Sequence, residues 1–392
     1  MKSRQFALLC GVGLFAFISY NLVRMPVLSL YAQSLGAGPE TIGFIVSAST
    51  LTGVFLKWPA GALSDICDRR WLLLAGLLAF ALPPFFYQFV PGVGWLIALR
   101  FAHGMATAVF APIALALVAD LRREARGAAY GAYTAATQAG AMLGPVLGGW
   151  LVVSSGFPSA FVAAGILGTA AFLLFLLMRL PPQAPHAVSG AAPTAVVREM
   201  ARGARTVLGN VRVVITSITD GARQIANGAL MAFLPIYVVG IGLDAAQAGV
   251  LFGVQSVTSF FSRPTMGWAS DRVGRRPLIV LGLVVCAASL AAIPFTRPFG
   301  ALMALSVLFG FGEAIVNASA AALVADLSEL KTLGSAMGMQ GAIMDIGHTS
   351  GPILAGLLIG ALGFQAAFSI IAGVVLLAAA VFRFGVGSER PA

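Results

Sequence analysis

Long stretches of apolar residues follow one another from end to end of the chain, and short polar segments separate them. About 20 apolar residues are enough for one helix to cross the hydrocarbon core of a bilayer. The pattern therefore predicts twelve membrane-spanning helices, six before a central break and six after it. Their expected ranges are 6–32, 41–64, 71–90, 93–119, 127–154, 158–180, 211–239, 245–269, 277–295, 299–325, 333–360 and 365–384.

The central break covers residues 181–210 and begins with "PPQAPHAVSGAAP". Prolines and small residues cannot continue a helix there. A basic, weakly amphipathic stretch follows, which either lies on the cytoplasmic membrane surface or forms a loop. The break predicts an N-terminal six-helix bundle over 1–180, a cytoplasmic linker over 181–210 and a C-terminal six-helix bundle over 211–392.

Composition excludes a soluble protein, because 59% of the residues are hydrophobic and only 10% are charged, whereas soluble proteins carry about 25% charged residues. Most Lys and Arg residues lie at the two termini or in the connections on one side, and the opposite loops hold only Arg297. Positive charge stays on the cytoplasmic side, so both termini are expected there, in a bacterial-type inner membrane. Topology thus accounts for the net charge of +10, and nucleic acid is not expected as a partner.

The phrase "ALVADL" begins at residue 116 and again at residue 322, 206 positions later. The same offset relates Asn21 to Asn227 and "GALSDICDRR" (61–70) to "GWASDRVGRR" (267–276). Parallel repeats of this kind pack about an axis along the membrane normal, with a substrate site between them. The expected fold class is therefore an all-α integral membrane protein, with twelve helices in two pseudo-symmetric six-helix bundles.

The segment "GWASDRVGRR" resembles the loop motif G-x-L-x-D-R-x-G-R-[KR] of the major facilitator superfamily, and the resemblance extends over essentially the whole chain. The earlier copy departs from the motif at Ile66 and Asp68. The resemblance implies a cytoplasmic latch that holds the two halves together and releases as they rearrange; charge-assisted pairs can break and remake in this way. The alternative is simple positive-inside anchoring. The implied latch residues are Gly61, Asp65, Arg69, Arg70, Gly267, Asp271, Arg272, Gly274, Arg275 and Arg276.

The fifth predicted helix contains "GAYTAATQAGAMLGPVLGG", which matches the pattern G-x8-G-x3-G-P-x2-G-G at every position. This segment resembles the antiporter motif of drug–proton exchangers in the superfamily and implies export. The alternative is tight helix packing, which glycine-rich spans also need. The motif residues are Gly131, Gly140, Gly144, Pro145, Gly148 and Gly149.

Polar and charged residues within the predicted spans are the candidates for binding and coupling. Six of them lie at membrane depth and are charged, three arginines and three carboxylates. Exposing all six to lipid would cost on the order of 15–20 kcal/mol, more than the roughly 5–15 kcal/mol of a typical protein's stability. They are expected to face a cavity or one another. The candidate cavity residues are Asn21, Arg24, His103, Gln138, Asp220, Arg223, Asn227, Gln255 and Asn317.

These candidates have alternative interpretations. Asp220 and Arg223 lie one helical turn apart and could neutralise each other. Asn21 and Asn227 could form hydrogen bonds between helices, and His103 could be a polar filler.

Proton coupling needs a buried group that loads and releases a proton near neutral pH, and a carboxyl group at membrane depth can do this. Glu313 has no cation one turn away in the sequence, and Asp345 lies one turn from His348. Arg100 lies in "LIALRFAHGMATA", which resembles a helix 4 motif whose arginine takes part in proton coupling in related exporters. The expected coupling residues are Glu313, Asp345, Arg100 and His348; the alternative is structural pairing of the acids with Arg24 or Arg100.

The sequence lacks a P-loop and has no grouped cysteines or histidines that would predict a metal site. An enzyme, a cofactor and a metal are therefore not expected. The prediction is a monomeric secondary transporter in the lipid bilayer that exports a small drug-like or amphiphilic molecule in exchange for protons. Three embedded arginines against three embedded carboxylates leave an anionic substrate open. The alternatives are a proton-coupled uptake symporter for a sugar or organic anion, and a non-transporting receptor or scaffold on the same fold.

Overall fold

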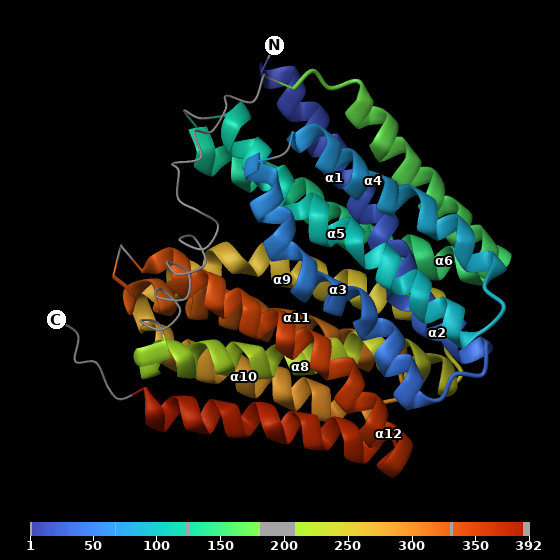
Figure 1. Ribbon diagram of the computed structural model, residues 1–392. Coiled ribbons are helices and arrows are strands. Elements are labelled where there is room, and N and C mark those ends of the chain that lie inside the picture. Colours follow the sequence, from blue (N-terminus) through green and yellow to red (C-terminus); the bar gives the residue numbers. More distant parts are fainter. Residues whose placement is uncertain (1, 67, 123–124, 181–207, 330–331, 387–392) are drawn as a thin grey trace. The chain divides into compact units, whose positions relative to one another are not determined.

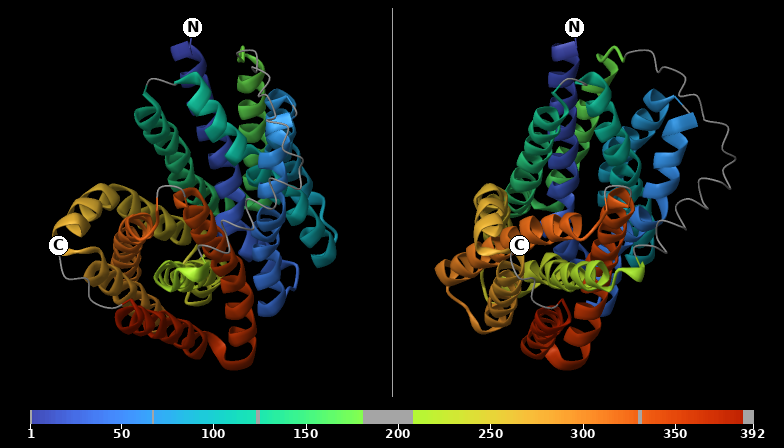
Figure 2. Two further views of the ribbon diagram at one scale, coloured as in Figure 1. Left: turned by 60° about the vertical axis from the view of Figure 1, so that its left-hand side comes forward. Right: turned by 90° about the vertical axis from the view of Figure 1, so that its left-hand side faces the viewer.

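The computed structural model describes residues 2–66, 68–122, 125–180, 208–329 and 332–386. These residues form helices joined by short connections, and no strand occurs among them (Figure 1, Figure 2). The helices of the N-terminal part are α1 (Lys2–Leu22), η1 (Val23–Val27), α2 (Leu28–Ser34), α3 (Pro39–Ile66), α4 (Arg69–Phe86), η2 (Tyr87–Phe89), α5 (Val93–Leu121) and α6 (Arg126–Leu176). The later helices are α8 (Val211–Gly240), α9 (Ala245–Val273), α10 (Arg275–Ala292), η4 (Ile293–Phe295), α11 (Phe299–Asp326) and α12 (Leu333–Gly385).

Every predicted membrane-spanning range overlaps a helix, a run of consecutive helices or one arm of a bent helix; the range 6–32 covers α1, η1 and α2. α6 bends at Gly156 (φ 81°) and α12 bends at Gly363 (φ 80°), so each contributes two of the predicted spans. A positive φ costs glycine little because it has no Cβ. Nine described helices are long and apolar enough to cross a membrane. The predicted helix of 245–269 is present as α9, although its polar side chains keep it out of that group.

By their contacts the residues form two compact units, one of Met1–Ser189 with Ala232–Gly253 and the other of Gly190–Met231 with Val254–Ala392. These units differ from the predicted halves over residues 232–253, and the predicted linker lies outside the described residues from 181 to 207. In the first unit α6 packs along α1 and beside α4, and α5 packs against α3 and α4. Its apolar core includes Leu9, Phe80, Phe110 and Phe175. In the second unit α10 packs against α11 and α12.

Candidate functional site

A polar cluster surrounds the ring of Tyr20 inside the first unit. We call it the Tyr20 cluster; it consists of Tyr20, Arg24, Ser49, Thr50, Tyr87, Arg100 and His103. Arg100 is completely buried. Its Nη1 donates to the Tyr87 hydroxyl at 3.4 Å, and its Nη2 donates to the Ser49 hydroxyl.

His103 lies on the other side of the Tyr87 hydroxyl, with Nδ1 3.1 Å from that oxygen. A neutral histidine has one donor and one acceptor nitrogen. The Tyr87 oxygen already accepts from Arg100, so its own proton is left for Nδ1 of His103. This assignment, inferred from the hydrogen bonds, places the histidine proton on Nε2.

Local sequence explains how these side chains meet. A Cβ on Gly104 would lie 2.7 Å from the backbone oxygen of Ser49, so only glycine lets α5 approach α3 this closely. That approach brings Ser49 to Arg100, which lies one turn earlier on α5. Arg24 lies in η1, the irregular segment between α1 and α2 that contains Pro26. Proline removes a helical donor there and interrupts the regular hydrogen bonding.

A second polar cluster lies in the other unit and centres on Arg223. We call it the Arg223 cluster; its members are Asp220, Arg223, Gln224, Asn227, Gln255, Glu313, Asn317 and Gln340. Arg223 is fully buried, and its guanidinium lies 2.8 Å from Asp220 Oδ1 and 3.1 Å from Glu313 Oε1. It also donates to Asn317 Oδ1 at 3.1 Å.

Amide side chains complete the Arg223 cluster. Gln340 donates to Asp220 at 3.3 Å, and Asn227 donates to the same Glu313 oxygen that Arg223 contacts, also at 3.3 Å. Gln255 donates to Asn227 at 3.4 Å. α8, α9, α11 and α12 therefore meet around two carboxylates and one guanidinium.

The partner of Glu313 differs from the expected alternatives. The pairing expected for a structural role was with Arg24 or Arg100, whereas the structure pairs Glu313 with Arg223, 90 positions away in sequence. Asp220 also pairs with Arg223, as the alternative interpretation of this helical pair expected. Asp345 and His348 are partly buried on α12, and Thr349 donates to the backbone oxygen of Asp345 at 2.7 Å.

The remaining predicted cavity residues have separate surroundings. Asn21 is buried and donates to the Phe17 oxygen of its own helix at 2.8 Å. It packs against Gly144, where a Cβ would lie 2.8 Å from its own Cβ. Asn21 and Asn227 are equivalent in the repeat, yet only Asn227 belongs to a polar cluster. Gln138 is partly buried on α6.

The loop motifs form ion pairs within each unit. Arg69 pairs with Asp120 at the end of α5, and Arg275 pairs with Asp326 at the end of α11. Both pairs obey the 206-residue offset, and both aspartates belong to the repeated "ALVADL". Within the same motif, Nη1 of Arg275 also lies 3.0 Å from Oδ1 of Asp271.

The two copies of the motif begin the next helix in different ways. Asp68 caps α4 by accepting from the backbone N–H of Arg70 at 2.8 Å. The equivalent Gly274 precedes α10 with a φ of 99°. The departure at Asp68 therefore has a structural reason, since a side-chain cap takes the place of a left-handed glycine.

Other motif residues have local roles or lie outside the description. Arg272 lies over the Trp268 ring at 4.0 Å, a cation–π contact. Gly267 has open space beside it, and Arg70 and Arg276 are partly buried. The surroundings of Gly61 and the side chain of Asp65 lie outside the description.

The glycine motif lies where α6 touches other helices. A Cβ would lie 2.7 Å from the Leu14 oxygen at Gly140 and 2.8 Å from the Leu22 nitrogen at Gly144. At Gly148 and Gly149 a Cβ would overlap the backbone oxygens of Leu22 and Ala245. Gly131 is different, because nothing lies within 4 Å of its Cβ position. Packing therefore explains four of the five motif glycines and not Gly131.

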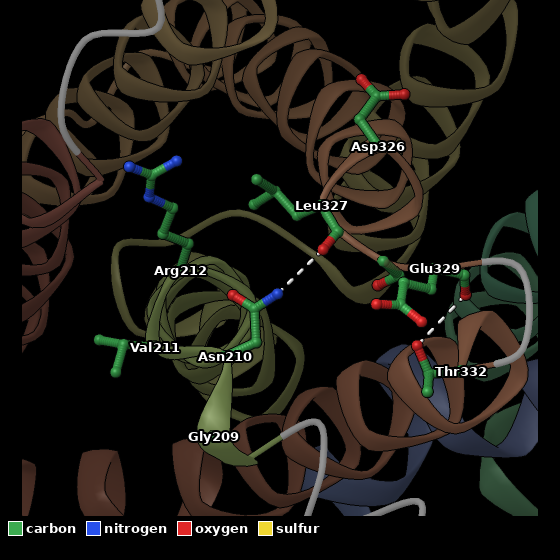
Figure 3. A pocket seen from close by; sticks show the side chains of 9 residues that line it. Gly209, Asn210, Val211, Arg212, Asp326, Leu327, Glu329 and Thr332 are labelled. Carbon is green, nitrogen blue, oxygen red and sulfur yellow. Dashed lines mark hydrogen bonds between the residues drawn. The ribbon is translucent and has the colours of Figure 1, made fainter.

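A pocket of about 740 Å³ opens at the start of α8 (Figure 3). Asn210 crosses it and donates to the Leu327 oxygen at 2.9 Å. Arg212 of α8 lines it as well, together with Asp326, Glu329 and other residues at or just after the end of α11. None of the predicted cavity residues lines it, so we do not assign it to the substrate.

Sequence reasoning missed Tyr20, Ser49, Tyr87 and Gln340, which are hydroxyl and amide residues of ordinary type within apolar helices. It also missed Asp120 and Asp326 as partners of Arg69 and Arg275. The signal for these two was available, because each aspartate repeats at the same offset as its arginine.

Membrane-length helices that carry clusters of charge in their interior define a polytopic membrane protein of the transport type. A sequence model described as the Major Facilitator Superfamily matches residues 9–244 and 216–392. The chain belongs to this family. It is a transporter and not an enzyme.

Among curated proteins, the chain is 27% identical over 373 residues to "Multidrug resistance protein MdtG" of Salmonella typhimurium, covering 91% of this chain and 89% of that protein. It is 23% identical to "Uncharacterized MFS-type transporter MJ1560" of Methanocaldococcus jannaschii, covering 94% of each.

Among solved structures, the nucleoside transporter NupG aligns with a TM-score of 0.80 at 15% identity, covering 98% of this chain and 100% of that one. A bacterial homolog of the human lysosomal transporter Spinster aligns with a TM-score of 0.80 at 15% identity, covering 98% and 96%. At these identities the structures show the shared fold alone.

Proposed function

We propose that this transporter exports a small drug-like or amphiphilic molecule in exchange for protons by alternating access. The observation that carries the proposal is the Arg223 cluster, in which two carboxylates share one buried guanidinium. One guanidinium faces two carboxylates there, so the cluster holds one acidic group more than its arginine can neutralise, and that group is the proposed proton carrier. Such a group can hold a proton in one conformation and release it in another.

The direction of transport has separate support. The glycine motif of α6 resembles that of drug–proton exchangers, and Gly131 of that motif has no packing role in the structure. A relative that aligns over nearly the whole chain carries the name multidrug resistance protein. Both observations favour export over uptake by a symporter.

Substitution of Glu313 and Asp345, the two acids that the sequence predicts as proton carriers, tests proton coupling. Glu313→Gln and Asp345→Asn each keep the size of the side chain and remove its charge. We expect at least one of them to abolish uptake driven by a pH gradient into inverted membrane vesicles, because the proton then has no carrier. The compound to be tested is chosen in a resistance screen. It is one to which a strain lacking its own exporters becomes resistant when it expresses this protein.

The same vesicles supply the control. Exchange of labelled for unlabelled compound needs no net proton movement, so the impaired variant should retain it. If both variants keep full gradient-driven transport, neither acid carries the proton. If the expressing strain accumulates compounds that control cells exclude, the protein is an uptake symporter.

A further inference from the structure

The positive charge of Arg100 has no carboxylate partner among the described residues. Its two terminal nitrogens donate to the neutral hydroxyls of Tyr87 and Ser49, and the guanidinium is completely buried. Arg223 in the other unit is equally buried but contacts two carboxylates. A buried charge with only neutral partners is costly and keeps its full attraction for an anion.

The Tyr20 cluster also has more donors than acceptors. Arg100 Nε and His103 Nε2 are buried and have no hydrogen-bond partner among the described residues. The tautomer argued above makes His103 Nε2 a donor, and arginine nitrogens can only donate. Buried donors without partners are rare in folded proteins and call for an acceptor.

Arg24 provides a partly accessible cation at the same ring. Its guanidinium carbon lies 5.7 Å from the centre of the Tyr20 ring, and that of Arg100 lies 6.0 Å from it. Arg24 is only partly buried. Its bond to the Thr50 hydroxyl is 3.4 Å long, near the limit for a hydrogen bond.

We infer that the Tyr20 cluster is the subsite for an acidic group of the transported molecule, a carboxylate or a phosphonate. Arg24 grips the group as a fork, and Arg100 behind the tyrosine adds an uncancelled positive field. The same field disfavours a cationic group at this position. The inference rests on the proposed function and names the substrate class that this function serves.

Two fluorescent probes with one skeleton test the inference, dansylglycine with a carboxylate and dansylglycinamide without one. Binding to the purified full-length protein in lipid nanodiscs is measured by fluorescence titration. We expect the wild type to bind the acid about tenfold or more tightly than the amide, since a charge-assisted pair is lost with the amide.

Arg24→Gln should reduce this preference to about threefold or less, and Arg24→Lys should restore part of it because the charge returns without the fork. Arg297→Gln is the matched control: it removes an exposed loop cation and should leave the preference unchanged. His103→Gln gives a second variant that leaves both arginines in place, and it should weaken binding of the acid more than that of the amide.

Equal or tighter binding of the amide by the wild type would overturn the inference, as would a lack of saturable binding of the acid. Survival of the full preference in both Arg24→Gln and His103→Gln would also overturn it. Failure of the proposed function is recognised by a separate experiment. The same purified protein is reconstituted into vesicles that contain a pH-sensitive dye, and proton movement is measured. Acid preference without proton movement contradicts exchange and leaves the subsite intact, whereas proton movement without acid preference contradicts the subsite alone.

Discussion

Arg100 and Arg223 are two fully buried arginines with opposite surroundings. Arg100 donates hydrogen bonds to hydroxyl groups, whereas Arg223 contacts carboxylates and an amide. A buried ion pair contributes little net stability, but removing one partner leaves an uncompensated charge and is strongly destabilising. The same type of residue is therefore expected to respond differently to substitution in the two units.

Arg223→Met should lower the free energy of unfolding by about 3–5 kcal/mol, because Asp220 and Glu313 then lose their shared cation inside the protein. Adding Asp220→Asn should recover part of the loss, since it removes one of the stranded charges. The apparent melting temperature of the purified protein measures both effects. The exposed Arg383→Met is the matched control and should melt like the wild type. Equal melting temperatures of Arg223→Met and Arg383→Met would show that the Arg223 cluster does not contribute to the stability of the protein.

At the scale of helices, the repeat is visible in the ion pairs between helices as well as in the amino-acid sequence. Arg69–Asp120 joins the start of α4 to the end of α5, and Arg275–Asp326 joins the start of α10 to the end of α11. Each pair holds adjacent helices of one unit together at the same end. Gly140, Gly144 and Gly148 of α6 have a comparable effect without charge, because they allow close backbone contact with α1.

Gly144→Ala should destabilise the protein by about 1–3 kcal/mol, because the added methyl group would lie 2.8 Å from the backbone nitrogen of Leu22 and force α1 away. Gly131→Ala adds the same methyl group where nothing lies within 4 Å, so its thermal stability should equal or exceed that of the wild type. Melting temperature and export are measured on both variants. Loss of export in a fully stable Gly131→Ala protein would show that the motif does more than pack; full export would reduce it to packing.

For the whole molecule, the distribution of positive charge predicts on which side of the membrane the termini lie. The basic connections predict that both ends and the segment between α3 and α4 face the cytoplasm. Cys67 lies in that segment, between the described residues 66 and 68. It offers a chemical probe of orientation because the other two cysteines, Cys10 and Cys286, lie within helices.

In a variant with Cys10 and Cys286 replaced by serine, a membrane-impermeant thiol reagent should label Cys67 in inverted vesicles and not in intact cells. Denatured protein should react in both preparations, which controls for the presence of the thiol. Labelling of intact cells would contradict the orientation and the number of helices that precede Cys67.

The sequence alone determined the features that depend on local pattern. Helix positions follow from runs of apolar residues, the repeat follows from its constant offset, and the family follows from motifs that survive at fixed spacing. The bends at Gly156 and Gly363 also lie within two residues of the predicted helix boundaries. Each of these features is decided by residues close together in the chain, so their spacing is sufficient evidence.

Only the tertiary structure decided which buried groups meet. Glu313 could be placed at membrane depth from the sequence, but its pairing with Arg223 depends on how α11 and α8 are rotated toward each other. Arg100 likewise received hydroxyl partners from α3 and η2, which no spacing along α5 predicts. A single residue turns a helix face by about 100°, and hydrogen bonds tolerate only a few tenths of an ångström. The partners of buried charges are therefore set by packing between helices, and with them the opposite charge balance of the two clusters.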